Sequence, residues 1–411
     1  MKKDIYKIED ICEIKSGKRL PKDTDFADCE TDYPYIRARD IKNGKICTES
    51  LAYLEKEVQE KIKRYIINSG DIVLTIAGTI GEVGYATLDV DGYNLTENAV
   101  RLTSFAENVN SKYLFYTLQQ KQYRDYMQLI SGAAAQPKLG LYKVQRIKIE
   151  LPDIETQNKI ADILSTYDEL IENNNKRIAI LEQMAENLYK EWFVRFRFPG
   201  YKDVEFENGI PKGWKVVKLG DYVEVKGGKR LPEGKKLQTE PTQHPYIRIR
   251  DITTSKFISL NKDYEYIDNE TFDVLHCFVV DFKDIIISIV GTIGSVACVS
   301  KNLVGANLTE NCVKLVNSKH FTNSYLYHAL NSKAGKASIQ SGIVGATQPK
   351  LPIYNIKRIK LLKPQEHLIK KFTKRIEPID EEIMHLMDMN QNLIKQRDLL
   401  LPRLMSGKLE V

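Results

Sequence analysis

The sequence lacks the motifs of the common catalytic and cofactor sites. It contains no GxxxxGK[ST] phosphate loop, no GxGxxG cofactor turn and no HExxH zinc site. The NPPY or DPPY tetrapeptide of adenine methyltransferases is also missing. We therefore expect no catalytic residue, no metal site and no cofactor in this chain. A methyltransferase with a degenerate motif is the alternative that these absences leave open.

Paired cysteines and long apolar runs are missing as well. The six cysteines form no CxxC pair, which disfavours a zinc ribbon and a disulfide scaffold, so we expect reduced and mostly buried thiols. No apolar run approaches the roughly 18 residues of a membrane span. The first residues lack the apolar centre of a secretory signal, which predicts a cytoplasmic protein without a membrane partner.

Length and charge favour a globular protein with several domains. The 411 residues, 42% of them hydrophobic, suffice for two or three domains that each bury a core. The formal net charge of +6 favours a polyanionic partner, but a basic soluble enzyme would fit the charge equally well.

The chain repeats once over nearly its full length, with an offset of 211 to 213 residues. The matched segments are KSGKRLP at 15–21 with KGGKRLP at 226–232, PYIRARDI at 34–41 with PYIRIRDI at 245–252, GTIG at 78–81 with 291–294, NLTEN at 94–98 with 307–311, and QPKL at 136–139 with 348–351. The offset varies by only two residues, which indicates two copies of one domain with small loop insertions inside them. The repeat predicts a pseudo-symmetric pair of globular domains.

Each copy has the pattern of an α+β domain. Short alternating or apolar runs such as IYKIEDICEIK and DIVLTIAG predict strands separated by glycine turns, and residues 110–130 predict one helix. The GTIGEVG stretch at 78–84 resembles a phosphate cradle, but its place between two strands favours a hairpin turn. Pro152 and Asp153 fall where a strand gives way to a helix, which predicts that Asp153 caps that helix.

A long helix follows each copy. Apolar positions from Ile160 to Trp192 step by four and three, and the positions 212 residues later repeat them in the same phase. Such a seam makes a helix of roughly 50 Å. Pro378 predicts a short lead-in helix before the second long one. The predicted domains are 1–152 and 200–363, and the predicted helical regions are 153–199 and 364–411.

A two-fold axis between the copies would make the two helices antiparallel, so facing residues should have a constant sum of residue numbers. Placing the two seam asparagines opposite each other sets that sum at 564. The predicted pairs are Asn174 with Asn390, Ile178 with Leu386, Leu181 with Ile383, Ile171 with Leu393, and Leu164 with Leu400. The alternative is that each helix packs only on its own domain.

Cationic and amide side chains recur at equivalent loop positions in both copies. They are Lys18, Arg19, Lys229 and Arg230; Arg37, Arg39, Arg248 and Arg250; Lys138 and Lys350; and Gln136 and Gln348. Arginine and lysine reach phosphates and guanine, and glutamine can contact adenine, so we identify these residues as candidates for DNA binding. Solvated loops or salt bridges are the alternative. Arg37 and Arg39 alternate along one predicted strand face and could instead pair with Asp40.

The whole chain resembles the specificity subunit of type I restriction-modification systems. The resemblance rests on GIPKGWKVVKLGDYVEVKGGKRLP at 209–232, on GDIVLTIAGTIG and KDIIISIVGTIG, on SGAAAQPKLGLYKVQRIKIELP at 131–152, and on NKIADILSTYDELIE and LLLPRLMSGKLEV in the helices. The first copy departs from the second because it lacks the GIPKGW lead.

This resemblance implies two target recognition domains that each read one half of a split site in double-stranded DNA. It also implies that the helices form the spacer and bind two modification subunits, which carry S-adenosylmethionine and the chemistry, and that restriction subunits can join the complex. The fold implied is α+β, with two α/β recognition domains separated by a pair of long antiparallel coiled-coil helices. A coiled-coil adaptor that binds proteins but not DNA remains the other alternative.

Overall fold

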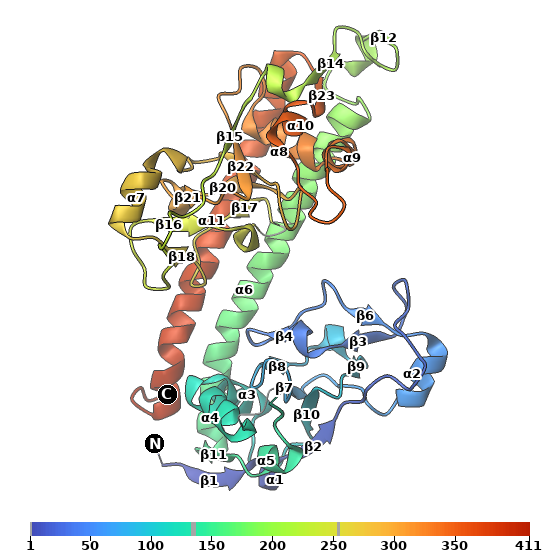
Figure 1. The fold of residues 1–411 in the computed structure, drawn as a ribbon. Coiled ribbons are helices and arrows are strands. Elements are labelled where there is room, and N and C mark those ends of the chain that lie inside the picture. Colours follow the sequence, from blue (N-terminus) through green and yellow to red (C-terminus); the bar gives the residue numbers. More distant parts are fainter. Residues whose placement is uncertain (1, 133–136, 253–254) are drawn as a thin grey trace. The chain divides into compact units, whose positions relative to one another are not determined.

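The computed structural model describes residues 2–132, 137–252 and 255–411 (Figure 1). The chain divides into two compact units. Unit 1 comprises Met1–Leu170 and Leu393–Val411, and unit 2 comprises Ile171–Asn392. The two long helices, α6 (Ile154–Tyr189) and α11 (Glu366–Ser406), each contribute residues to both units.

Within its described residues, unit 1 combines short strands with five α-helices besides the two long ones. Its strands are β1 (Asp4–Lys7), β2 (Glu13–Ser16), β3 (Pro34–Ile36), β4 (Ile41–Lys42), β5 (Lys45–Ile46), β6 (Ala52–Tyr53), β7 (Ile72–Thr75), β8 (Val83–Tyr85), β9 (Asn94–Leu95), β10 (Ala99–Thr103) and β11 (Lys148–Leu151). Its helices are α1 (Ile8–Ile11), α2 (Lys56–Ile62), α3 (Ser111–Gln119), α4 (Lys121–Ser131) and α5 (Leu141–Gln145).

Unit 2 repeats this arrangement. Its strands are β12 (Phe206–Glu207), β13 (Ile210–Pro211), β14 (Lys215–Lys218), β15 (Glu224–Gly227), β16 (Pro245–Ile247), β17 (Phe257–Ile258), β18 (Glu265–Tyr266), β19 (Ile285–Ser288), β20 (Val296–Val299), β21 (Asn307–Leu308), β22 (Cys312–Val316) and β23 (Lys360–Lys363). Its shorter helices are α7 (Asn269–Leu275), α8 (Asn323–Asn331), α9 (Lys333–Ser341) and α10 (Ile353–Lys357).

The sheets of the two units correspond, except that the main sheet of unit 2 has the further edge strand β17. The main sheet has the order β2-β10-β7-β8 in unit 1, and β15-β22-β19-β20-β17 in unit 2. A three-stranded sheet follows in each, β6-β3-β9 and β18-β16-β21, and a strand pair closes each domain, β1-β11 and β14-β23. Because β1 pairs with β11 over four residues, as β14 does with β23, the first strand is held equally well without the GIPKGW lead.

The apolar runs form the buried strands that the sequence predicts. All four residues of β7 and of β19 are buried, because these strands lie inside their sheets. The GTIGEVG stretch joins the antiparallel strands β7 and β8, which confirms the hairpin turn. Asp153 accepts a hydrogen bond from the backbone N–H of Thr156 at 2.9 Å and thereby caps α6, as predicted.

Three local predictions were wrong. Residues 110–130 form two helices, because Gln120 has an extended ψ of 141° that separates α3 from α4. The segment IYKIEDICEIK is interrupted by the short helix α1 between β1 and β2. Helix α11 passes through Pro378 without a break. The proline removes one backbone hydrogen bond there, and the full burial of Ile376 and Ile383 on either side offsets that loss.

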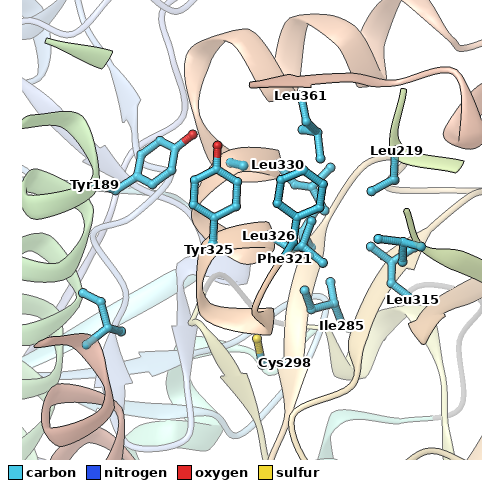
Figure 2. Close-up of a cluster of buried hydrophobic side chains, with 14 of the residues drawn as sticks. Tyr189, Leu219, Ile285, Cys298, Leu315, Phe321, Tyr325, Leu326, Leu330 and Leu361 are labelled. Atoms are coloured by element: carbon cyan, nitrogen blue, oxygen red, sulfur yellow. The ribbon is translucent and has the colours of Figure 1, made fainter. Parts of the chain in front are cut away.

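Both long helices contribute to the cores. In unit 1, Leu164 of α6 and Leu404 of α11 belong to the same buried cluster as the main sheet. In unit 2, Tyr189 of α6 and Phe372 of α11 pack in the cluster that includes Tyr325 of α8. Figure 2 shows the rings of Tyr189 and Tyr325 next to each other, and their centroids are 5.8 Å apart. The helices are therefore an integral part of each folded unit.

The thiols are less buried than the sequence suggested. Three cysteines (Cys12, Cys298 and Cys312) are buried, Cys47 is half-buried, and Cys29 and Cys277 are exposed, all six as free thiols. Within the described residues, no helix is both long and apolar enough to cross a lipid bilayer.

Candidate DNA interface and helix pair

The KRLP loop of unit 1 is fixed by backbone contacts to the NLTEN segment. The N–H of Lys18 donates to the carbonyl of Leu95 at 2.8 Å, and the buried Tyr35 donates its hydroxyl to the carbonyl of Lys18 at 2.7 Å. Gly17 lies so close to this segment that a Cβ would sit 2.0 Å from the carbonyl oxygen of Thr96. The loop therefore requires glycine there, and the following cationic side chains project from a rigid backbone.

Unit 2 builds the same loop from the equivalent residues. The N–H of Lys229 donates to the carbonyl of Leu308 at 2.9 Å, and Tyr246 donates to the carbonyl of Lys229 at 2.8 Å. A Cβ at Gly228 would lie 2.1 Å from the carbonyl oxygen of Thr309. The two loops share this geometry, which explains why KRLP, PYI and NLTEN recur together in the sequence.

The arginine of each KRLP loop forms an ion pair with a glutamate that the sequence analysis did not identify. Arg19 contacts Glu97 at 3.0 Å, and Arg230 contacts Glu310 at 2.9 Å. The hydrogen bond and the charge of Glu310 raise the pKa of the Arg230 guanidinium further above its ordinary value. Both arginines remain more than 80% exposed, so they are oriented by the glutamates and still accessible to a ligand. These glutamates belong to the repeated NLTEN segment, and that repetition was the signal in the sequence that could have predicted the ion pairs.

The lysines of these loops are exposed and have no anionic partner among the residues that the structure describes. The ammonium of Lys18 lies 5.6 Å from the ring centroid of Tyr65, and that of Lys229 lies 5.9 Å from the ring of Phe278. Aromatic contact positions each cation without neutralising it.

Arg37 and Arg248 are bonded to aspartates of the turns that follow strands β3 and β16. The strands end at Ile36 and Ile247, and the following turns are capped by Asp40 and Asp251, so these arginines do not share a strand face with their neighbours. Arg37 binds both carboxylate oxygens of the buried Asp40, at 2.9 and 3.1 Å. This geometry confirms the alternative in which Arg37 pairs with Asp40.

The Arg248 side chain repeats that arrangement with Asp251, at 2.9 Å for both contacts. Burial acts to lower the pKa of the Arg248 guanidinium, but its bonds to Asp251 and Glu265 overcome that effect and raise the pKa. We therefore regard Arg37 and Arg248 as structural supports of the turns.

The neighbouring arginines face solvent. Arg39 is 71% exposed and 3.9 Å from Asp40, and Arg250 is 64% exposed and 3.5 Å from Glu265. In unit 2, three of the predicted arginines line one open cleft of about 390 Å³, together with Tyr246 and the Thr309–Asn311 segment. Those arginines are Arg230, Arg248 and Arg250. The structure thus brings together three segments of the sequence, around Arg230, Arg248 and Glu310.

The QPKL segments lie beside the turns that follow β7 and β19. The backbone N–H of Leu139 donates to the carbonyl of Ile76 at 2.8 Å. The backbone N–H of Leu351 donates to the carbonyl of Ile289 at 2.9 Å. The preceding Lys138 and Lys350 are exposed, as is Gln348. Gln136 lies outside the described residues.

Helices α6 and α11 are antiparallel within each unit. In unit 2, Asn174 donates from Nδ2 to Oδ1 of Asn390 at 2.9 Å, and both side chains are buried. Asn390 in turn donates to Oδ1 of Asn175 at 2.9 Å. The ion pair of Arg177 with Glu382, at 2.6 Å, continues the antiparallel order.

The other predicted seam residues are distributed between the units. Ile178, Leu181, Ile383 and Leu386 share the core cluster of unit 2. Leu164 and Leu400 share that of unit 1, where Asp168 and Arg397 form an ion pair at 2.5 Å. Ile171 and Leu393 fall on either side of the boundary between the units, so that pair stays a prediction.

The asparagine layer yields a stability prediction. We expect Asn174→Leu to lower the free energy of unfolding of unit 2 by about 1–3 kcal/mol, because Oδ1 of Asn390 then loses its donor in a buried site. We expect the double change Asn174→Leu with Asn390→Leu to be neutral or stabilising. Urea unfolding followed by tryptophan fluorescence measures this, since both tryptophans lie in unit 2. Additive losses in the double variant would contradict the pairing.

A buried ion pair joins the second domain to the helices, and the sequence reasoning missed it. Lys256, just before β17, contacts Asp380 of α11 at 2.5 Å, and the two side chains are only 2% and 1% exposed. The backbone N–H of Lys256 donates to Glu182 of α6 at 2.6 Å. Burial raises the pKa of Glu182 above its ordinary value. Asp168 at the equivalent position of unit 1 is also bonded, to Tyr116 and Arg397.

No group of histidine, cysteine and carboxylate side chains suited to a metal ion occurs among the described residues.

The family model described as "Type I restriction modification DNA specificity domain" matches the chain twice, at residues 2–183 and 211–396. The MjaIX specificity subunit of a type I restriction enzyme from Methanocaldococcus jannaschii is 30% identical, with 99% of this chain and 94% of that protein covered. The HindI specificity subunit from Haemophilus influenzae is 22% identical, with 91% and 94% covered.

A crystal structure of a type I restriction-modification S subunit from M. genitalium has the same fold. Its TM-score is 0.55 at 17% identity, and 98% of this chain and 96% of that chain are covered. The two domain matches, the full-length relative and the shared fold together establish that the chain belongs to the family of type I restriction-modification DNA specificity subunits.

Proposed function

We propose that each of the two DNA specificity domains reads one half of a split site in double-stranded DNA, with the KRLP loop and its neighbours as the contact surface. The observation that carries this proposal is that the same loop occurs in both domains. Each loop has a glycine that cannot be replaced without a clash, a lysine without a salt bridge among the described residues, and an exposed arginine held by a glutamate. Lys18, Arg19, Arg39 and their equivalents would bind phosphates. Lys138, Lys350 and Gln348, which lie near the turns that follow β7 and β19, are further candidates.

The helices have a separate role in the proposal. Helices α6 and α11 would set the spacing of the two half-sites and bind two modification subunits, and restriction subunits would join them. The chain itself would carry out no bond chemistry, and S-adenosylmethionine would bind to the modification subunits. The absence of methyltransferase motifs from the sequence supports this division of labour.

Phosphate contacts predict a measurable salt dependence. We expect Lys229→Gln to lower the slope of log K against log[salt] by about 0.9, because one contact releases about that many counterions from duplex DNA. Lys18→Gln should have the same effect in the first domain. The measurement is the anisotropy of a dye-labelled duplex titrated with the complex of this chain and its modification subunit at several salt concentrations.

Lys218 provides a matched control, because it is an exposed lysine of unit 2 on the separate strand pair β14-β23. Lys218→Gln should leave the slope unchanged. Equal slopes for the Lys229 variant and the unmodified chain would show that this lysine does not contact phosphate. A complex that binds no duplex at low salt would instead favour a protein-binding adaptor.

A further inference from the structure

Unit 1 contains a cavity of about 780 Å³ between the end of α11, helices α3 and α4 and the strand pair β1-β11. Tyr113, Thr117 and Met405, all less than 4% exposed, form its floor, and the hydroxyl of Thr117 contacts the sulfur of Met405 at 3.7 Å. A volume of this size is typical of sites that enclose a ligand group.

The same place in unit 2 is filled by aromatic side chains of the chain itself. Tyr325, the equivalent of Tyr113, packs against Phe193 with the ring centroids 4.9 Å apart. Trp214 then contacts Phe193 at 6.0 Å and stacks on Phe198 at 5.1 Å. These aromatic residues are at most 5% exposed, so they complete the core at that end of the domain.

Unit 1 has charged residues at the positions of two of these aromatic residues, and Met405 of the cavity floor stands in the place of Phe193. Lys3 stands in the place of Trp214, and Glu410 in the place of Phe198. The cavity wall carries three cations (Lys3, Arg403 and Lys408) but only one carboxylate, that of Glu150, which pairs with Lys3 at 3.3 Å. Arg403 and Lys408 are exposed and form no salt bridge with any residue that the structure describes. The cavity therefore combines an apolar floor with an electropositive rim.

We propose that this cavity binds a segment of a second protein that inserts an aromatic side chain onto Tyr113 and Thr117 and places carboxylates beside Arg403 and Lys408. The aromatic group would complete in unit 1 the packing that Phe198 and Trp214 provide in unit 2. The carboxylates would pair with the two cations that have no partner. This inference does not depend on the proposed reading of DNA.

A short acidic peptide with one aromatic residue provides the test. The probe is dye-labelled Glu-Glu-Phe-Glu-Glu, titrated by anisotropy into the intact purified chain. We expect saturable binding, and about tenfold weaker binding when serine replaces the phenylalanine, because the apolar contact of the ring with the cavity floor is then lost. Arg403→Glu should weaken binding of the phenylalanine peptide roughly fivefold.

Lys395→Glu is the matched control, since Lys395 is an exposed lysine of α11 that does not line the cavity. It should leave peptide binding unchanged. Absence of saturable binding at millimolar peptide, equal affinity of the serine peptide, or equal losses in the Arg403 and Lys395 variants would overturn the proposal. It would also be overturned if a twelve-base-pair duplex bound more tightly than the peptide and Arg403→Glu weakened that binding equally, because the cavity would then belong to a DNA surface.

Discussion

Replacing Lys256 by methionine should destabilise unit 2 by about 3–5 kcal/mol, because it leaves the carboxylate of Asp380 buried without its cation. The hydroxyl of Ser324 also donates to Asp380, at 3.4 Å, but it cannot supply a charge. The double variant Lys256→Met with Asp380→Leu removes both charges and should recover most of the stability. Urea unfolding followed by tryptophan fluorescence reports on unit 2, where both tryptophans are buried.

The exposed ion pair of Arg177 with Glu382 serves as the control. It joins α6 to α11, but its side chains are 50% and 40% exposed, so Arg177→Met should cost less than about 1 kcal/mol. A Lys256→Met chain that unfolds at the same urea concentration as the Arg177→Met chain would show that the buried pair does not hold the domain to the helices.

A single methyl group at Gly228 should reduce DNA affinity by roughly tenfold or more. The added Cβ would lie 2.1 Å from the carbonyl oxygen of Thr309, and because that atom is part of the backbone, the KRLP loop must move. Overpacking of this kind costs about 1–3 kcal/mol. The displaced loop would lose its bond to Leu308 and misplace Lys229 and Arg230.

The same substitution at the adjacent Gly227 is the control for Gly228→Ala. A Cβ there meets only Ile353, at 3.7 Å, which is an ordinary contact. Gly227→Ala should therefore bind duplex DNA like the unmodified chain in the anisotropy assay, while Gly228→Ala binds weakly. Tryptophan fluorescence would verify that both variants are folded. Indistinguishable affinities of the two variants would contradict the role given to the loop.

The repeat made most of the fold predictable from the sequence. Matched segments such as PYIRARDI and PYIRIRDI require equivalent strands, and the seam asparagines could be placed opposite each other because residue numbers along antiparallel helices have a constant sum. The uninterrupted α11 was not predictable in this way, since the cost of Pro378 is offset by tertiary burial that no local pattern displays.

The sequence identified which residues belong to the candidate site, but not which of them support the fold and which are accessible to a ligand. Repetition drew attention to Arg37 and Arg248 as strongly as to Arg39 and Arg250, because duplication preserves structural and binding residues alike. Only the three-dimensional contacts show that the first two are held by buried aspartates. Lys256 and Asp380 are 124 residues apart and have no shared motif, so their pairing depends on packing alone.

The proposed function requires the two domains to read their two half-sites independently. Residues 1–152 can be exchanged for the aligned segment of the MjaIX specificity subunit, and both chains expressed with the modification subunit of this system. Single-molecule sequencing of the genomic DNA then maps the methylated motif for each. The account predicts a split motif in which one half changes and the other is retained. Methylation in which both halves change, or in which neither does, would contradict it.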